Sequence, residues 1–371
     1  MGTVLIHAGM GKAGSSTIQG WLAPNAAELR ERDIDVVVAR LRREESRAVG
    51  IDVTDYRSGQ VQSNDVIIAY WNQGVDKRAV FGRLFEGLDE AATRHRVVVL
   101  TGEALQRVFW RPDEEFLRAL EALAGRHEVR VAYYVRPQHG ALEAAWRQWG
   151  FRTGHRPSHD LATRSKALHY FDTYASTRRL APSVSFEPRP FRPDLLHLGE
   201  PVADFVHHFL GLAGPSTEDG STRVNRGLPL EVVNALRHAP PGLFWSSTFD
   251  NRRLGLIKKV VGDLDAPETE ETKRSRLILQ AHCHDTFEEG NSRLIDALGW
   301  NTDAYVPAVE IDRHDRERGL QPLDELWEPR ASPAELTFLY TALDRLVAAS
   351  AQPDGHLARR RMWRRFKARR N

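Results

Sequence analysis

The sequence predicts an α/β fold: an open, mostly parallel sheet flanked by helices, with a helical part toward the C-terminal end. Two observations support this class. Short runs of β-branched residues recur through the first half of the chain, and sequence compatible with helix separates each run from the next. This alternation is typical of a parallel sheet, because parallel strands need a crossover connection. Beyond about residue 225 the chain is mostly helical in character.

The expected elements follow from the apolar periodicity along the chain. Strands are expected at residues 3–7, 36–38, 66–69, 97–100 and 129–135, with a weaker candidate at 184–186. Helices are expected at residues 15–22, 140–151, 202–212, 228–236, 274–280 and 334–349. Irregular sequence at 212–225 and 301–333 suggests boundaries. We therefore expect an α/β core over residues 1–215, a mostly helical extension over 216–350 and a basic tail over 351–371.

The composition indicates a globular protein of a reducing compartment. Hydrophobic residues make up 41% and charged residues 27%, which argues against a disordered or membrane-spanning chain. Cys283 is the only cysteine, so neither an intrachain disulfide nor a cluster of thiolate metal ligands can form. The N-terminus leads straight into an apolar strand rather than a signal peptide, and no apolar run reaches 18 residues. We expect a cytoplasmic protein.

A basic segment lies at the C-terminal end. The net charge is +2, but residues 359–371 hold eight Arg or Lys and no acid, which leaves the rest of the chain at −6. Met362, Trp363 and Phe366 lie between these cations, so the segment could bind an anionic membrane surface as a short basic helix. A solvated, frayed tail is an equally good interpretation. Nucleic acid is not expected as a partner, because the acidic body offers no basic groove or recognised module.

A glycine loop follows the first expected strand. Gly9, Gly11 and Gly14 surround Lys12, and residues 15–17 supply three hydroxyls at the start of a helix. Backbone amides, a cation and hydroxyls at a helix N-terminus favour phosphate binding, although a glycine-rich turn with serine caps would have a similar sequence. The loop of nucleoside triphosphatases, G-x-x-x-x-G-K-[ST], does not match.

A second interpretation of the same loop is a dinucleotide site. Residues 9–14 match G-x-G-x-x-G, a weak signal by itself, and a nicotinamide oxidoreductase would also need an acid about 20 residues further on. Asp33 and Asp35 are near enough in sequence to keep this alternative open.

Residues 7–19, HAGMGKAGSSTIQ, resemble the phosphosulfate-binding loop of bacterial sulfotransferases, H-I-G-x-x-K-T-G-T-T-x-I-Q. The resemblance continues, in order, at LTGE (100–103), YVRPQ (134–138), FEPRPF (186–191) and NRGLP (225–229), so it covers about residues 1–240. The loop and YVRPQ are fairly specific; the last two motifs are weak. The resemblance implies the P-loop-like sulfotransferase fold and 3′-phosphoadenosine-5′-phosphosulfate (PAPS) as sulfonate donor to a hydroxyl or amine. The acceptor would be a small molecule, a glycan or a lipid, bound in a site that the helical extension shapes.

The resemblance also implies roles for individual residues. Lys12 would contact the 5′ phosphate and the bridging oxygen, and Arg136 would hold the 3′ phosphate. Glu103 would accept the acceptor's proton as general base, although capping of a following helix is nearly as good an explanation. The loop that holds the 5′ phosphate would consist of Gly11, Lys12, Ala13, Gly14, Ser15, Ser16 and Thr17. No metal is expected, because Lys12 supplies positive charge and no residue cluster has metal-ligand spacing.

Two departures from the family pattern stand out. Ala13 replaces a threonine of the loop, and Ala144 stands where the family has a serine for the 3′ phosphate, eight residues after Arg136. That position is expected at the start of the helix after Arg136. These departures keep one alternative open, a non-catalytic nucleotide-binding protein on a sulfotransferase scaffold. The basic tail keeps open another, a peripheral membrane or nucleic-acid binder driven by that tail. His7 is a weaker candidate base, because a histidine beside a glycine loop is as often a packed strand residue.

Overall fold

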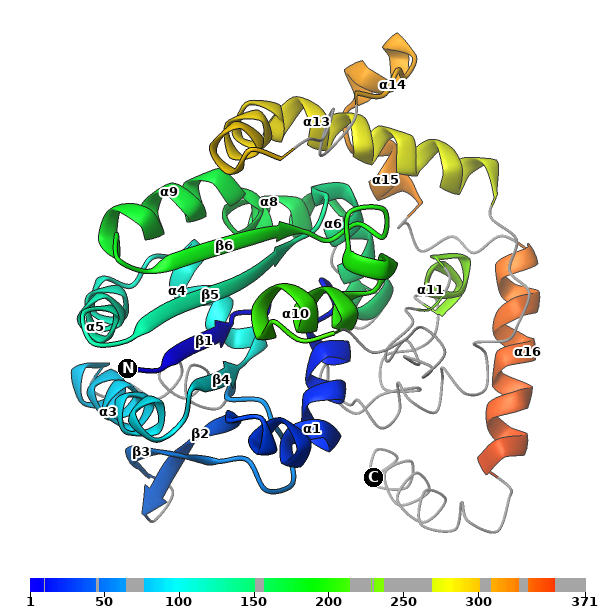
Figure 1. Ribbon diagram of the computed structural model, residues 1–371. Helices are drawn as coiled ribbons and strands as arrows, with labels where there is room; N and C mark the ends of the chain where they lie inside the picture. The colour runs from blue at the N-terminus through cyan, green and yellow to red at the C-terminus, as the bar shows by residue number, and fades with distance from the viewer. Residues whose placement is uncertain are drawn as a thin grey trace. The chain divides into compact units, whose positions relative to one another are not determined.

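The computed structural model describes residues 1–9, 11–44, 47–64, 77–150, 157–213, 228, 230–236, 269–300, 308–326 and 333–350. A six-stranded sheet with helices around it dominates the first half of the chain (Figure 1). Its strands are β1 (Thr3–His7), β2 (Ile34–Glu44), β3 (Arg47–Asp55), β4 (Val97–Thr101), β5 (Glu128–Val135) and β6 (Ser185–Pro190). The expected class, α/β with an open and mostly parallel sheet, is confirmed.

The strand order is β3-β2-β4-β1-β5-β6, and every neighbouring pair is parallel except β2 and β3. The chain leaves β1 toward β2 on one side, whereas it leaves β4 toward β5 on the other side of β1. Strands whose connections diverge in this way leave a crevice at their carboxyl ends, where open α/β sheets bind ligands. The glycine loop follows β1 at this edge.

Helices cover both faces of the sheet. On one face α1 (Ser15–Glu31) packs against α10 (Pro201–Leu210), and on the other α3 (Lys77–Arg94) and α9 (Tyr170–Leu180) both pack against α5 (Glu114–Ala124). The remaining short elements of this part are η1 (Glu103–Gln106), α4 (Arg107–Trp110), α6 (Gln138–Ala145), the π-helical turn η2 (Trp146–Gly150), α8 (Pro157–Leu168) and η3 (His197–Gly199).

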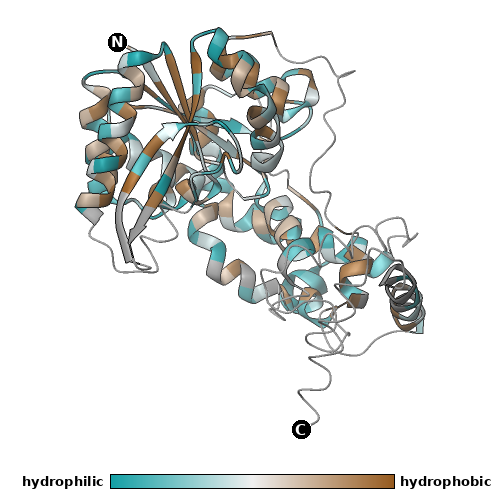
Figure 2. Cartoon of the chain, turned by 90° about the horizontal axis from the view of Figure 1, so that it is seen from below, coloured by the Kyte–Doolittle hydropathy of each residue, from teal (hydrophilic) through white to brown (hydrophobic). Residues whose placement is uncertain are grey.

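Alternation along β5 shows how the two faces are filled. The Tyr134 ring lies 6.1 Å from Phe209 of α10, whereas the neighbouring Tyr133 ring lies 6.3 Å from Phe109 of α4 on the opposite face. Successive strand residues point to opposite faces, so each tyrosine fills a different layer of the core. All five residues of β4 are buried, as a strand covered on both sides requires. The strands in the middle of the sheet are accordingly mostly hydrophobic (Figure 2).

Two differences from the expected elements concern an edge strand and the length of the first helix. Residues 47–55 form the antiparallel edge strand β3, which was not expected because charged residues and Gly50 interrupt its apolar pattern. Helix α1 continues to Glu31, past Pro24. The Asn25 side chain donates to the Trp21 carbonyl at 2.7 Å, which helps to satisfy the turn that the proline disturbs. The strand expected at 66–69 lies outside the described residues.

Toward the C-terminal end the described elements are all helices, as expected: α11 (Leu230–Leu236), α13 (Glu270–Leu298), α14 (Arg313–Arg318), α15 (Gln321–Glu325) and α16 (Pro333–Ser350). Among the residues that the structure describes, none of the helices combines the length and the apolar composition that crossing a membrane requires.

The chain divides into two compact units, each built from three segments. Unit 1 comprises Met1–Ala141, Thr163–Arg226 and Cys283–Ala308, and unit 2 comprises Leu142–Ala162, Gly227–His282 and Val309–Asn371. Segments of the two units therefore alternate along the chain, and boundaries between them fall inside α6, α8 and α13. From the sequence, three consecutive parts were expected instead, divided by composition. The basic tail lies outside the described residues.

Candidate functional site

The glycine loop folds tightly onto the start of α1. A Cβ on Gly9 would lie 2.3 Å from Oγ of Ser15, so only glycine allows this approach. Gly14 is the N-cap of α1 with φ 76°, and its carbonyl accepts bonds from the amides of Thr17 (2.9 Å) and Ile18 (3.1 Å). The N-cap has no side chain to cover the first-turn amides, which is the arrangement that suits an anionic ligand at a helix N-terminus.

Lys12 has a strained backbone in this loop. Its φ is 71°, in the left-handed region that side chains other than glycine rarely adopt. The next residue, Ala13, is fully buried, so a threonine hydroxyl at this position would also have to be buried. Ser15 is buried as well, whereas Ser16 and Thr17 are partly exposed.

Arg136 joins the loop from the neighbouring strand. It follows the last residue of β5, which runs parallel to β1, and its Nη1 donates to the Lys12 carbonyl at 3.0 Å. The Tyr170 hydroxyl donates to the Arg136 carbonyl at 2.7 Å. A Cβ on Gly140 would lie 3.1 Å from Nε of Arg136, so the guanidinium lies close to the first turn of α6. The Arg136 side chain and the Lys12 backbone, both from residues expected at the site, are thus brought together.

Glu103 reaches the loop from the other neighbour of β1. It begins the 3₁₀ turn η1 just after β4, and a Cβ on Gly11 would lie 3.1 Å from its Oε1. Gln106 of the same turn accepts a bond from the Gly11 amide at 3.3 Å. The capping explanation for Glu103 loses weight, because the Ala104 amide at the start of this turn is bonded instead by Oδ1 of Asn64, at 2.8 Å.

All nine residues expected at the site therefore lie in unit 1, around one loop at the carboxyl edge of the sheet. Four further residues that position them were not identified from the sequence: Asn64, Gln106, Gly140 and Tyr170. Asn64 and Tyr170 lie far from the motifs in sequence and match no recognised pattern, so no local signal could have found them.

His7 is a packed strand residue. Its Nδ1 lies 2.9 Å from the Thr101 hydroxyl, which also accepts a bond from the Gln19 amide at 3.2 Å. Because the ring is completely buried, the pKa of His7 is lowered to about 3. It therefore stays neutral at physiological pH, and its contacts tie β1, β4 and α1 together behind the glycine loop.

Ala144 does not lie where it was expected. Helix α6 begins at Gln138, so Ala144 is in its second turn rather than at its start. At about 1.5 Å per residue, this position lies about 9 Å along the helix from Gln138. Gln138, whose side-chain amide is a conceivable replacement for the missing serine hydroxyl, is buried and donates elsewhere, to the Leu168 carbonyl (3.2 Å) and to Oδ1 of Asn291 (2.7 Å). The expected helix start at this point was wrong.

The acid required for a dinucleotide site is at the wrong edge of the sheet. Asp35 is the second residue of β2 and pairs in register with Val98 near the start of β4, whereas the glycine loop lies beyond the far ends of these parallel strands. Its carboxylate is buried and bonded by Arg30 Nε at 2.8 Å. Neither Asp35 nor the neighbouring Asp33 can therefore contact a ribose at the loop, which removes the main support for an oxidoreductase.

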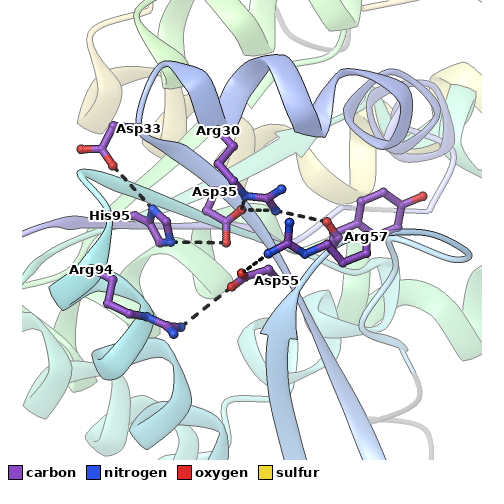
Figure 3. Close-up of polar contacts among 8 residues, drawn as sticks. Arg30, Asp33, Asp35, Asp55, Arg57, Arg94 and His95 are labelled. Carbon is purple, nitrogen blue, oxygen red and sulfur yellow. Dashed lines mark hydrogen bonds and ion pairs between the residues drawn. The ribbon is translucent and has the colours of Figure 1, made fainter.

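Asp35 belongs instead to a cluster of charges at the amino edge (Figure 3). Oxygen and nitrogen atoms of Asp35, Asp55 and His95 lie within 4.8 Å of one another, a grouping that the sequence spacing did not suggest. Burial, followed by the neighbouring Asp55 carboxyl, raises the pKa of Asp35, against the opposing effect of Arg30. Arginines at 30, 57 and 94 pair with these carboxylates. Because three guanidinium groups already pair with these two carboxylates, a divalent cation has little electrostatic energy to gain here.

Unit 2 contains a small pocket of its own. Its empty volume is ≈ 370 Å³, part of which is open solvent. It is lined by Glu143, Trp146, Leu230, Asn234, Ser275, Arg276, Leu279, Leu323 and Leu326. Arg276 pairs with Glu143 at 2.9 Å, and the buried indole Nε1 of Trp146 has no hydrogen-bond partner among the described residues. Leucine side chains and the Trp146 ring supply the apolar part of its lining, and the Arg276–Glu143 pair supplies the charged part.

Comparison of the chain with protein-family models, with curated proteins and with solved structures found no match.

Proposed function

We propose that this protein is a sulfotransferase that moves a sulfonate group from PAPS to a hydroxyl or amine acceptor. The observation that carries the proposal is the meeting of three residues from separate motifs at one loop. Lys12 follows β1, Glu103 follows β4 and Arg136 follows β5, and the three strands are adjacent in the sheet. A nucleotide that carries phosphates at both ends needs cations at two points of such an edge.

The proposed reaction is a direct in-line transfer. The acceptor oxygen attacks the sulfur, a new S–O bond forms, and the bond between sulfur and the bridging phosphate oxygen breaks. Glu103 takes the acceptor's proton, and adenosine 3′,5′-bisphosphate leaves with the bridging oxygen. Negative charge develops on that oxygen, where Lys12 and the N-terminus of α1 supply a preorganised positive field. Arg136 binds the 3′ phosphate, and the chemistry requires no metal.

The acceptor is a small molecule, a glycan or a lipid, and we propose that the enzyme acts in the cytoplasm, in part at an anionic membrane surface. The decisive assay incubates the protein with PAPS and acceptors from a cell extract and detects sulfonated products by their mass shift. Lys12→Ala should lower turnover by about 100-fold or more, as the loss of one preorganised charge contact does elsewhere. Nearly full activity in this variant would make the loop structural.

Nucleotide binding tests the proposal without an acceptor. Adenosine 3′,5′-bisphosphate should stabilise the protein against heat more than adenosine monophosphate does, since a ligand at 100 times its Kd adds about 2.7 kcal/mol. Equal shifts for both nucleotides would remove the case for a 3′-phosphate site at Arg136.

A specific observation favours a second candidate, a non-catalytic nucleotide-binding protein on the same scaffold: Ala13 is fully buried and supplies no hydroxyl to the loop. That protein would show the nucleotide preference and no sulfonate transfer.

A further inference from the structure

Arg136 is bound to the glycine loop itself. Its Nη1 donates to the backbone carbonyl of Lys12 at 3.0 Å, across 124 positions of sequence. A residue whose only task was to hold a 3′ phosphate would not need this contact. The bond instead connects the expected 3′-phosphate residue to the backbone of the expected 5′-phosphate loop.

The carbonyl that Arg136 holds belongs to the strained residue of the loop. Lys12 has φ 71°, and a side chain other than glycine remains in the left-handed region only where its surroundings hold it there. Gly14, two residues further on, is left-handed as well, at φ 76° and ψ 0°. These two left-handed residues turn the amides that lead into α1, and successive turned amides form the concave surfaces that bind anions.

Arg136 is well placed to keep this conformation. The Tyr170 hydroxyl fixes its carbonyl at 2.7 Å, and burial raises the pKa of Tyr170 far enough that the hydroxyl keeps the proton it donates. Gly140 leaves room for the guanidinium, whose Nε would lie only 3.1 Å from any Cβ at that position. A planar guanidinium has five N–H donors, so Arg136 can hold the loop carbonyl and a phosphate at the same time.

We propose that Arg136 is a positioning residue for the 5′-phosphate loop as well as a ligand of the 3′ phosphate: it holds Lys12 in its left-handed conformation and so preforms the cradle. This inference rests on the proposed function. It makes one distinctive claim, namely that affinity for a nucleotide without a 3′ phosphate depends on Arg136.

The test measures Kd by calorimetry for adenosine monophosphate and for adenosine 3′,5′-bisphosphate. Arg136→Met should weaken binding of both nucleotides, the monophosphate by about tenfold or more. The decisive variant is Arg136→Lys, which keeps the positive charge but loses the planar fork. Because long-range attraction is retained in Arg136→Lys, a loss of about fivefold or more in monophosphate affinity must come from the loop.

The matched control is Arg192→Met. Arg192 lies just beyond the end of β6 at the same edge of the sheet and pairs with Asp194 at 2.7 Å, so this change removes a cation whose ion pair lies outside the glycine loop. It should leave both affinities within about twofold. Thermal unfolding of each variant without ligand separates loss of the site from loss of the fold.

The outcomes distinguish the two proposals. If either Arg136 variant binds the monophosphate as tightly as the wild type but the bisphosphate more weakly, the residue contacts only the ligand, and the positioning role is wrong while the proposed function stands. If the wild-type protein binds neither nucleotide, the proposed function fails, and the inference fails with it.

Discussion

At the residue scale, the site combines motifs that were visible in the sequence with supports that were not. The loop residues and Arg136 could be named because each lies in a short motif directly after an apolar strand. Asn64, Tyr170 and Gly140 could not, because hydrogen-bond partners and close approaches between distant segments exist only once the chain has folded. His7 illustrates the reverse case: its position beside the loop suggested chemistry, whereas complete burial makes it neutral and structural.

Glu103 offers a test of mechanism at this scale. Glu103→Gln keeps the size of the side chain that lies against Gly11 but removes the ability to accept a proton. Turnover should fall by about 100-fold or more, as expected for loss of a general base, while Kd for the bisphosphate stays unchanged. Sulfonate transfer and calorimetry measure the two effects.

The control for this experiment is Glu115→Gln, on the exposed side of α5, which should alter neither quantity. Loss of nucleotide binding in Glu103→Gln would assign Glu103 to the architecture of the loop instead of to proton transfer.

At the element scale, the parallel strands were predictable because apolar residues fill most of each one. The helices were predictable where apolar residues recur at helical spacing. Two features show the limits of that reasoning. Strand β3 was not predicted, because an edge strand needs only a partial apolar face. Part of α6 and all of η2 belong to unit 2, although the sequence assigns them to the α/β core. Tertiary packing decides both, and it leaves no local pattern in the sequence.

The docking of α10 depends on one buried ion pair. Asp204 is fully buried and accepts bonds from Arg189 Nε and Nη2, each at 2.8 Å, from the Tyr134 hydroxyl at 2.8 Å and from the His197 amide at 2.9 Å. Pro201 at the start of α10 lies against Gly14 of the loop, where a Cβ would approach it to 3.0 Å. The ion pair therefore also supports the loop.

We expect Asp204→Asn to destabilise the protein by about 3 kcal/mol at pH 7, because it leaves the Arg189 charge partly buried without its partner. Burial would raise the pKa of Asp204, but the bonds from Arg189 and its other partners outweigh burial and lower it. A carboxyl with a lowered pKa stabilises the fold above its unfolded pKa, about 3.9, and this contribution is lost as the pH falls through the folded value.

The difference between the wild type and Asp204→Asn should therefore be largest at neutral pH and shrink below about pH 4, which urea unfolding at several pH values measures. The control is Asp194→Asn, which breaks the exposed pair with Arg192 and should cost less than about 1 kcal/mol. A difference that stays constant down to pH 3 would contradict the role given to the charge of Asp204.

At the scale of the whole molecule, the chain separates an acidic body from a basic tail. Residues 359–371 carry eight cations, and the remainder has a net charge of −6. The fold class followed from the sequence at this scale, because alternating strands and helices leave few other arrangements. The two units could not be predicted from the sequence. Each is built from three separate segments, and the contacts that join those segments are not encoded in composition.

The charge separation makes a testable claim about membranes. Deleting residues 357–371 should leave sulfonate transfer to soluble acceptors unchanged and abolish binding to vesicles of phosphatidylserine and phosphatidylcholine at low salt. Each basic residue near an anionic surface contributes about 1 kcal/mol, and the attraction falls off within about 10 Å at 0.1 M salt, so cosedimentation should weaken steeply as salt is added.

A matched variant replaces Met362, Trp363 and Phe366 with serine and keeps all eight cations. If electrostatics dominate, this variant still binds at low salt; if it does not bind, insertion of the apolar side chains is essential. Vesicle binding that survives the deletion would show that the acidic body, not the tail, carries the membrane contact.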